Sequence, residues 1–360
     1  MRTWVMLGLL VLAMGVGLSV VQASNPADLN NDGVVDMLDV AIVCEGWLWT
    51  VLDPYALAFI PGGTFEMGDS FGEGPDGERP VHTVTLDSFY IGKYEVTDQQ
   101  YCDFLNSAES QGLITVISDV VCKAGFGTSY RYCDTSASNS YSQIAYDGSV
   151  FSVGTKDGRS MVNDPVVMVS WYGAVAYCNW RSEQEGKQVC YDLSTWNCDF
   201  AKKGYRLATE AEWECAARGG LSGKRFPWGD TINHSYANYQ GNGSAYTYDT
   251  SPYTTLTYHQ TWNDGIYPYT SPVDSFAANG FGLHDMAGNV TEWCNDWYSS
   301  LYYSSNSHTN PTGPSSGTSR ILRGGGWGHD AYRCRTARRD GNVPGYRNYI
   351  VGFRVVLPAE

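Results

Sequence analysis

The 360-residue chain is poor in charged residues, and above all in positive ones. Lys and Arg number 23 against 38 Asp and Glu, which gives a formal net charge of −15. Charged residues make up 17% of the chain, whereas an average soluble domain has about 25%. Because a strongly acidic chain does not attract the phosphate backbone of DNA or RNA, we expect no nucleic-acid partner.

Long apolar runs are missing beyond the first residues of the chain. The charged start at Arg2, the apolar run 5–21 and the small residue Ala23 are typical of a secretory signal peptide, residues 1–23. An uncleaved membrane anchor is the alternative, for which this run is slightly short. We therefore expect a secreted or cell-surface/periplasmic protein that has no membrane span after signal cleavage.

The chain also lacks the short motifs of common enzymes. It contains no Gly-x-Ser-x-Gly elbow, no phosphate-binding loop and no His-Glu-x-x-His helix, and its six histidines show no metal-ligand spacing. Residues 59–356 show no repeat of fixed period, which argues against solenoids and propellers.

Aromatic residues, glycine and cysteine take the place of charge. The 12 Trp, 26 Tyr, 12 Phe and 40 Gly indicate ordered loops held by aromatic contacts and a low helix content. The ten cysteines suit an oxidising compartment, where thiols usually pair. The sequence does not determine the pairing, but Cys190 with Cys198 and Cys122 with Cys133 are the most plausible local disulfides.

A calcium-loop pattern follows the signal peptide, within residues 24–52. Oxygen side chains stand at loop positions 1, 3, 5, 9 and 12, Gly33 permits the turn at position 6, and position 7 offers a backbone carbonyl. The predicted ligands are Asp28, Asn30, Asp32, Val34, Asp36 and Asp39. The loop resembles a dockerin repeat, which implies a cohesin-like partner, although dockerins carry two repeats and only one is present. An acidic linker is the alternative.

The remaining chain predicts short strands and a few helices. Strands are expected over 82–86, 89–96, 166–169 and 352–356, and helices over 97–106 and 171–185. Thr209 and Glu212 form a capping-box pattern that starts a third helix. The segments 127–153 and 298–319, rich in small and polar residues, are expected to be surface loops.

Six ordered blocks carry a resemblance to a known family. They read FIPGGTFEMG at 59–68, YEVT at 94–97, GYRLATEAEWE at 204–214, FPWG at 226–229, NGFGLHDMAGNV at 279–290 and GFR at 352–354. Together they resemble the formylglycine-generating enzyme, or sulfatase-modifying factor, family. The resemblance implies one compact α+β domain of the C-type-lectin-like kind over 55–358, with low regular secondary structure and bound calcium.

The resemblance also implies two calcium sites. The first would use Asn238, the carbonyl of Tyr239, Asp264 and the carbonyl of Ile266; the second would use Asp285, the carbonyls of Gly288 and Val290, and Glu292. Such oxygen atoms are the ligands that a hard cation takes. The alternative is that these residues only form turns and cap helices.

The family's chemistry does not carry over to this sequence. Family enzymes oxidise a substrate cysteine with oxygen and copper, using two thiolates that follow a Gly-Gly-Ser segment. Here those positions fall near His329 and on Ala331, and Cys334 stands alone three residues later. We therefore expect calcium as the cofactor and no copper.

The segment 327–349 concentrates arginine and aromatic residues in a chain otherwise short of cations. These are the residue types that dominate binding hot spots. The segment also resembles the variable region of proteins diversified by retroelements on a lectin-like scaffold. The candidate ligand-binding residues are Gly328, His329, Asp330, Tyr332, Arg333, Arg338 and Asp340. Trp327 and Arg339 are instead expected in the core.

Three functions remain open at this stage. The first is an exported, calcium-stabilised protein that binds a protein, peptide or glycan ligand at a cell surface. The second is a formylglycine-generating-type oxidoreductase acting on a protein cysteine through altered ligands, and the third is a structural cell-surface module.

Overall fold

The computed structural model describes residues 53–304 and 308–359. The predicted signal peptide, 1–23, and the predicted calcium-loop segment, 24–52, lie outside these residues. Residues from Pro54 onward form one compact unit. None of its described helices is both long enough and apolar enough to cross a membrane.

The described part of the chain contains three α-helices, α3 (Asp98–Ser110), α4 (Trp171–Gln184) and α5 (Glu210–Arg218). The capping box predicted for α5 is confirmed, because Thr209 accepts from the backbone of Glu212 and the Glu212 carboxylate accepts from the backbone of Thr209. Gly219 ends α5 with a left-handed φ of 57°, which a residue with a side chain rarely adopts.

The strands are short and form several small sheets, with a 3₁₀ turn η1 (Asp76–Glu78). One four-stranded sheet has the order β1 (Leu57–Ile60), β4 (Phe89–Gly92), β20 (Val355–Pro358), β14 (Arg206–Leu207), and a second has the order β18 (Asp340–Asn342), β17 (Arg320–Arg323), β15 (Thr291–Trp297), β19 (Val351–Gly352). The three-stranded sheets are β16 (His308–Thr309), β3 (His82–Leu86), β2 (Gly63–Met67), and β5 (Ile114–Ile117), β6 (Val120–Lys123), β7 (Arg131–Asp134). The two-stranded ones are β8 (Ile144–Tyr146) with β9 (Phe151–Val153), β10 (Thr155–Lys156) with β11 (Arg159–Ser160), and β12 (Tyr191–Asp192) with β13 (Asn197–Cys198).

Several sequence-based boundaries need correction. The strand predicted over 82–86 is confirmed, but the one over 89–96 ends at Gly92 and the one over 352–356 divides into β19 and β20. In the predicted strand 166–169, only Val169 forms a β-bridge, an isolated one to Cys133. The segment 127–153, expected to be a loop, contains β7, β8 and β9.

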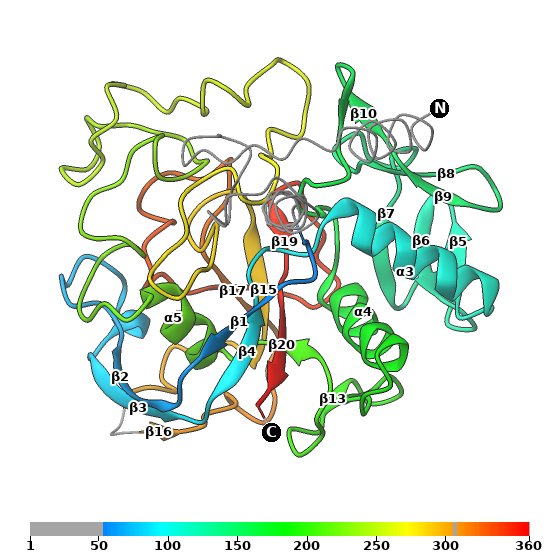
Figure 1. Cartoon of the computed structure of the whole chain (residues 1–360), viewed down its shortest axis with the longest axis horizontal. Helices are drawn as coiled ribbons and strands as arrows, with labels where there is room; N and C mark the ends of the chain where they lie inside the picture. Colours follow the sequence, from blue (N-terminus) through cyan, green and yellow to red (C-terminus); the bar gives the residue numbers. More distant parts are fainter. Residues whose placement is uncertain (1–52, 305–307, 360) are drawn as a thin grey trace, which may run out of the picture. The chain divides into compact units, whose positions relative to one another are not determined.

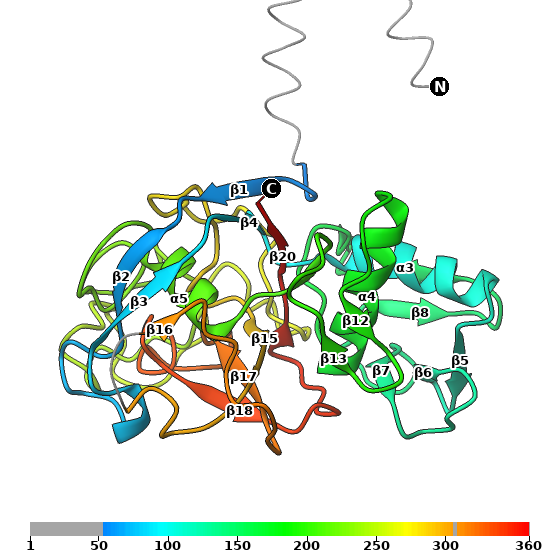
Figure 2. The same cartoon turned by 90° about the horizontal axis from the view of Figure 1, so that it is seen from below.

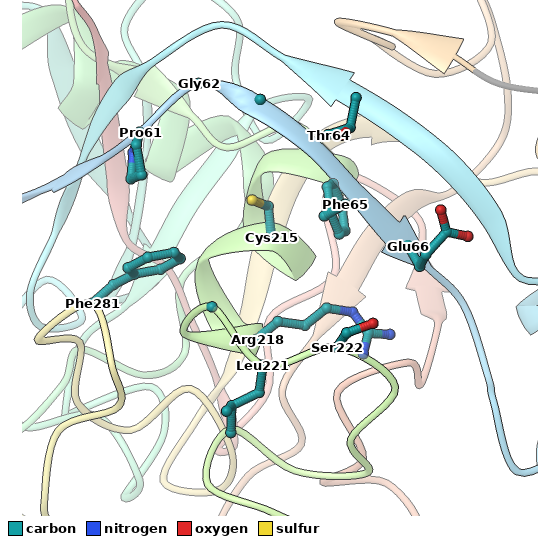
Figure 3. A pocket seen from close by; sticks show the side chains of 12 residues that line it. Pro61, Gly62, Thr64, Phe65, Glu66, Cys215, Arg218, Leu221, Ser222 and Phe281 are labelled. Carbon is teal, nitrogen blue, oxygen red and sulfur yellow. The ribbon is translucent and has the colours of Figure 1, made fainter.

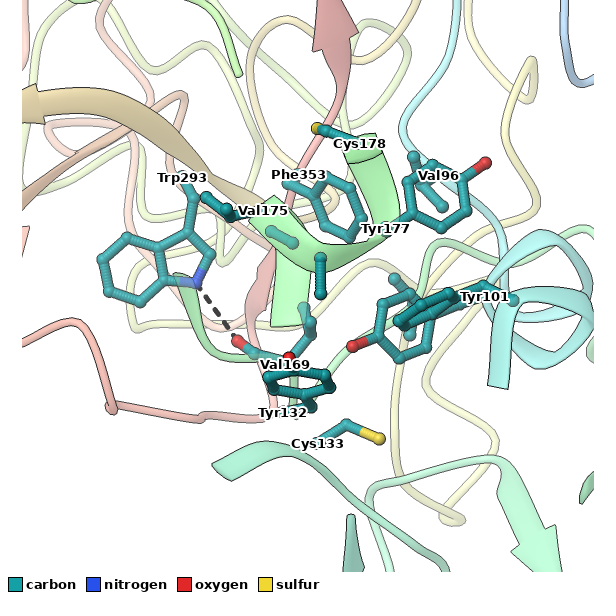
Figure 4. Packing of buried hydrophobic residues seen from close by; sticks show 14 of the residues in the cluster. Val96, Tyr101, Tyr132, Cys133, Val169, Val175, Tyr177, Cys178, Trp293 and Phe353 are labelled. Atoms are coloured by element: carbon teal, nitrogen blue, oxygen red, sulfur yellow. Dashed lines mark hydrogen bonds between the residues drawn. The ribbon is translucent and has the colours of Figure 1, made fainter. Parts of the chain in front are cut away.

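Two hydrophobic clusters hold the elements together. The larger one packs α3 and α4 against β5, β6 and β7 on one side of the molecule (Figures 1 and 2). Its centre is largely aromatic, with Tyr101, Tyr177 and Phe353 in mutual contact, and the indole of Trp293 donates to the carbonyl of Val169 (Figure 4). The second cluster packs α5 against β1, β2, β3, β4 and β20.

The segment 327–349 crosses the face opposite β1. Figure 2 shows β17 and β18 at one edge of the molecule and β1 at the other. The segment starts four residues after β17 and ends just before β19, so both of its ends are fixed to the sheet that contains β15.

Candidate calcium site and binding surface

The segment 327–349 alternates between buried and accessible residues. Trp327, Cys334, Arg335 and Arg339 are buried, which fits the expectation that Trp327 and Arg339 belong to the core. All seven candidate ligand-binding residues reach the surface at least in part. Arg333 is exposed, and the half-buried ones are Gly328, His329, Asp330, Tyr332, Arg338 and Asp340.

Carboxylates take up the positive charge of this segment. Each of its arginines pairs with an acidic side chain: Arg333 with Asp340 at 2.6 Å, Arg335 with Glu78 at 2.9 Å, Arg338 with Glu78 at 3.5 Å, Arg339 with Glu210 at 2.7 Å and Arg347 with Asp134 at 3.0 Å. The surface is therefore not a patch of unpaired cations. Only the Arg333–Asp340 pair is well exposed on both sides, at 44% and 37%.

Arg323 of β17 fixes the backbone beneath this surface. Its guanidinium donates to the carbonyls of Thr336, Ala337 and Arg338, at 2.9, 3.3 and 2.7 Å, and pairs with Glu214 of α5. Burial alone would raise the pKa of Glu214, but the guanidinium groups of Arg218 and Arg323 lower it to about 2. This buried ion pair joins α5 to the turn that carries the candidate residues.

His329 and Asp330 connect the segment to the loop around residue 240. The backbone of Gln240 donates to the His329 carbonyl at 2.7 Å, and the Tyr246 hydroxyl donates to Asp330 at 3.0 Å. Burial and the nearby charge of Arg333 lower the pKa of His329 to about 4, so its imidazole is neutral at neutral pH.

The space next to His329 is too small for a substrate. The cavity lined by Gly324, His329, Arg333 and Asp340 has a volume of about 10 Å³, which is room for about one water molecule. A large ligand could only lie on the outside of the segment.

Cys334 is placed as a structural residue. It is fully buried beside Tyr239 and Ala331, and burial raises the pKa of its thiol well above the ordinary value. The chain turns tightly above it, because Gly325 has a φ of 71° and a Cβ there would lie 2.9 Å from the Cys334 sulfur. His329 and Ala331, which the resemblance places near and at the family's two thiolate positions, offer no sulfur ligand for copper.

No disulfide joins the nine cysteines in the described part of the chain. Cys190 directly precedes β12 and Cys198 is the last residue of its partner strand β13, and Cys122 and Cys133 lie on the neighbouring strands β6 and β7. The predicted local disulfides therefore join segments that already lie close together, and they stay predictions.

Asp285 and Glu95 form a pair of buried carboxylates at the second predicted calcium site. Both oxygen atoms of Asp285 and Oε2 of Glu95 are buried without a hydrogen-bond partner. Burial raises the pKa of Asp285 to about 7, and burial together with the Asp285 charge raises the pKa of Glu95 well above its ordinary value. Unpartnered buried carboxylates fit a hard cation, which would neutralise them.

The other predicted ligands of this site follow Asp285 in the sequence. Gly288, with a φ of 88°, and the buried Val290 lie on the turn that leads into β15. Glu292 is buried, but its carboxylate accepts from Arg354 at 2.7 and 2.8 Å and from the indole of Trp213 at 2.8 Å. Glu95 was not among the sequence-based candidates, although it lies in the block at 94–97.

The residues of the first predicted calcium site make other contacts. Asn238 donates to the carbonyl of Tyr269 at 2.8 Å, and the carbonyl of Tyr239 lies 3.0 Å from a ring nitrogen of His234. Asp264 pairs with Lys156 at 3.0 Å and accepts from the backbone of Ile266, as a turn-forming residue does. This arrangement leaves the first site less suited to a cation than the second.

The described residues contain no cluster of side chains that could by itself hold a metal ion. Within 53–304 and 308–359, no group of three or more His, Cys, Asp or Glu side chains is arranged to hold a metal ion. A calcium ion beside Asp285 and Glu95 would therefore need backbone carbonyls as further ligands.

The comparison with known proteins agrees with the blocks read from the sequence. The chain is 35% identical to the formylglycine-generating enzyme of Streptomyces coelicolor over 84% of this chain and 88% of that one. It is 30% identical to the inactive C-alpha-formylglycine-generating enzyme 2 of Mus musculus, over 85% and 87% of the two chains.

Solved structures support the same fold. Treponema denticola variable protein 1 superposes with a TM-score of 0.58 at 25% identity, over 84% of this chain and 95% of that one. The fold is thus α+β and C-type-lectin-like with low regular secondary structure, as expected. The model of the sulfatase-modifying factor enzyme 1-like domain matches residues 52–359, and the chain belongs to this formylglycine-generating enzyme-sulfatase family.

Proposed function

We propose that this protein is an exported, calcium-stabilised ligand-binding protein built on the sulfatase-modifying factor scaffold. The segment 327–349 would form its binding surface, for a protein, peptide or glycan ligand at a cell surface. The predicted signal peptide would export the protein, and the predicted calcium loop would join it to a cohesin-like partner.

One observation carries the proposal. The single cysteine of the segment, Cys334, is fully buried with a raised thiol pKa, and the positions expected for the copper thiolates hold His329 and Ala331. The scaffold is therefore kept while its known reactive pair is missing. A mouse relative of similar length is itself named as inactive, which supports a member of this family that does not act as the enzyme.

The alternative is a formylglycine-generating-type oxidoreductase that acts on a protein cysteine. The 35% identity to a formylglycine-generating enzyme favours it. A copper-loaded sample incubated with a Cys-x-Pro-x-Arg peptide and oxygen separates the two functions. We expect no formylglycine above a no-protein control by mass spectrometry, and product formation that survives Cys334→Ala would support the enzyme with altered ligands.

The binding surface is tested by changing only side chains that the fold does not need. Tyr332→Ser, Arg333→Ser and Asp340→Ser together remove the exposed ion pair and one ring; Arg338 loses its contact with Asp340 but keeps the one with the buried Glu78. Binding to the glycan or cell-surface protein array component that the parent recognises should be lost, with the melting temperature nearly unchanged. Retained binding by a folded triple variant would contradict the assignment of this surface.

A further inference from the structure

A cavity of about 360 Å³ lies between β2 and the C-terminal end of α5, far in sequence from 327–349 (Figure 3). Its apolar lining comes from three separate segments: Phe65 from β2, Cys215 from α5, and Leu221 and Phe281 from loops. The charged residues that also line it are Glu66 and Arg218, and Arg218 is paired with Glu214. Phe65, Cys215 and Phe281 are only partly buried, and Leu221 is 40% exposed. The cavity thus continues the second hydrophobic cluster to the surface.

β2 forms the edge of its sheet. In the described part of the chain it pairs with β3 alone, and β3 also pairs with β16. The Thr85 carbonyl accepts from Asn310, which follows β16, so the backbone groups of Thr85 point away from β2. In an antiparallel pair, two residues directly opposite each other either exchange both backbone hydrogen bonds or form none. Thr64 of β2 lies opposite Thr85, so its own N–H and C=O are also directed away from β3.

The same alternation applies to Glu66, whose partner Thr83 lies two residues from Thr85. Thr64 and Glu66 therefore present four backbone groups along the free edge, and both residues are exposed. Gly68 shows which partners such an edge takes. Its N–H donates to Glu214 at 2.8 Å and its carbonyl accepts from Arg218 at 2.9 Å, so two α5 side chains occupy the place of a neighbouring strand there.

An added strand would place its side chains by the same rule. Side chains of the added strand that lie on the same face of the sheet as Phe65 would enter the cavity, because directly opposite residues on neighbouring strands point to the same face. On the side of β2 the cavity is lined by residues 61–66, and this range includes the part of β2 that lacks a second partner strand. Main-chain groups and an apolar pocket thus lie side by side.

We propose that β2 binds an extended basic peptide segment as an additional β-strand, with one apolar side chain in this cavity. The backbone of Thr64 and Glu66 would form the strand hydrogen bonds, and Lys or Arg flanks would lie near the exposed carboxylate of Glu66. The charge of −15 favours a basic segment and disfavours a second copy of this chain, since two such chains repel each other. The site shares no residue with 327–349, so it goes beyond the proposed function.

Fluorescence polarisation of the full-length chain with labelled peptides tests this interaction. The probe is the peptide Lys-Thr-Val-Leu-Val-Thr-Lys, and its controls are a Glu-flanked peptide and a copy with N-methylated backbone amides. We expect saturable binding of the probe and an affinity lower by about tenfold or more for each control. The Glu-flanked peptide loses the charge-assisted contacts, and the N-methylated peptide loses the backbone hydrogen bonds.

Amide hydrogen exchange locates the contact. The amides of Thr64 and Glu66 should exchange freely in the protein alone and become protected with the peptide, while the amide of Phe65, which faces β3, is protected in both states. Thr64→Pro removes one edge donor and should weaken binding about tenfold or more, whereas Thr64→Val keeps the donor and should bind as the parent does.

The cavity has its own matched pair of variants. Leu221→Asp should abolish peptide binding, and Leu113→Asp, at a residue that is 54% exposed elsewhere, should leave it unchanged. Unchanged binding by Thr64→Pro or by Leu221→Asp would overturn the proposal, as would no binding of the probe. Protection of Thr64 and Glu66 in the peptide-free protein would assign the edge to another occupant, a second copy if protection rises with protein concentration and the chain itself if it does not.

Discussion

Two groups of buried carboxylates in this protein differ in what faces them. On α5, Glu210, Glu212 and Glu214 each meet at least one arginine at 2.7 Å or less. Asp285 and Glu95 are equally buried, yet no cation pairs with their free oxygens. The pKa of Glu214 is lowered to about 2 and that of Asp285 is raised to about 7, so between these two buried carboxylates the arginine partners account for the difference in direction.

The comparison indicates where a cation belongs. A buried carboxylate with a guanidinium partner is already neutralised, and adding a metal there would gain little. A pair of carboxylates that face each other without a cation is unfavourable unless one takes up a proton or both share a metal ion. The α5 group is therefore already neutralised by its arginines, and we propose the pair of Asp285 and Glu95 as the place where calcium stabilises the domain.

Breaking the α5 group should have the largest effect. Arg323→Met leaves Glu214 with one arginine fewer and frees the carbonyls of Thr336, Ala337 and Arg338. We expect the free energy of unfolding to fall by about 3–5 kcal/mol in a denaturant titration, because a buried charge loses its partner. Arg333→Met, at an exposed pair, is the control and should change it by less than about 1 kcal/mol.

The next largest effect is the pH dependence that Glu214 of α5 gives to the free energy of unfolding. The folded pKa of Glu214, about 2, lies below its ordinary value of 4.5, so its contribution is complete above pH 4.5 and is lost as the pH falls towards 2. The shift corresponds to about 3 kcal/mol. The difference in unfolding free energy between the parent and Glu214→Gln should narrow over that interval. A difference that stays constant with pH would contradict the lowered pKa.

Removal of calcium tests the role of the carboxylate pair Asp285 and Glu95. Chelation should lower the unfolding free energy of the parent by about 3 kcal/mol if calcium was present at about 100 times its dissociation constant. Asp285→Asn should lose most of this dependence, and in calcium-free buffer it should be at least as stable as the parent, because it removes an unpartnered buried charge. Thermal melts with and without chelator measure both effects.

Asp157→Asn at an exposed turn is the control for the calcium experiment. It should respond to chelation as the parent does. An Asp285→Asn protein that is less stable than the parent in both buffers would show that Asp285 acts through local hydrogen bonds and not through calcium.

Local features of the fold could be predicted from the sequence, since they depend on neighbouring residues. The capping box of α5 and the strand over 82–86 follow from residues a few positions apart, and the structure confirms both. The hairpin of β8 and β9 was missed because the wider segment 127–153 is rich in small and polar residues typical of loops, although its two strands are largely apolar. Its stability comes from the packing of Phe151 in the larger cluster.

Partners across the chain were the least predictable part of the site. Glu210 and Arg339 are 129 residues apart, and so are not linked by any local pattern. Sequence patterns gave no sign of the Glu210–Arg339 ion pair and missed Glu95, whose neighbour Asp285 is distant in the chain. The seven residues chosen in 327–349 all reach the surface at least in part, but the exposed Val343 and Gly345 were not among them.

The smallest effect belongs to an ion pair that water can reach. Lys224 and Asp230 pair at 2.7 Å, as closely as Arg339 and Glu210, but their side chains are 43% and 40% exposed. Water screens the exposed pair and both side chains lose freedom in it, so a double-mutant cycle with Lys224→Gln and Asp230→Asn should give a coupling below about 1 kcal/mol that shrinks further with salt. A coupling as large as that of the buried pair would mean that distance, rather than burial, decides the strength of these contacts.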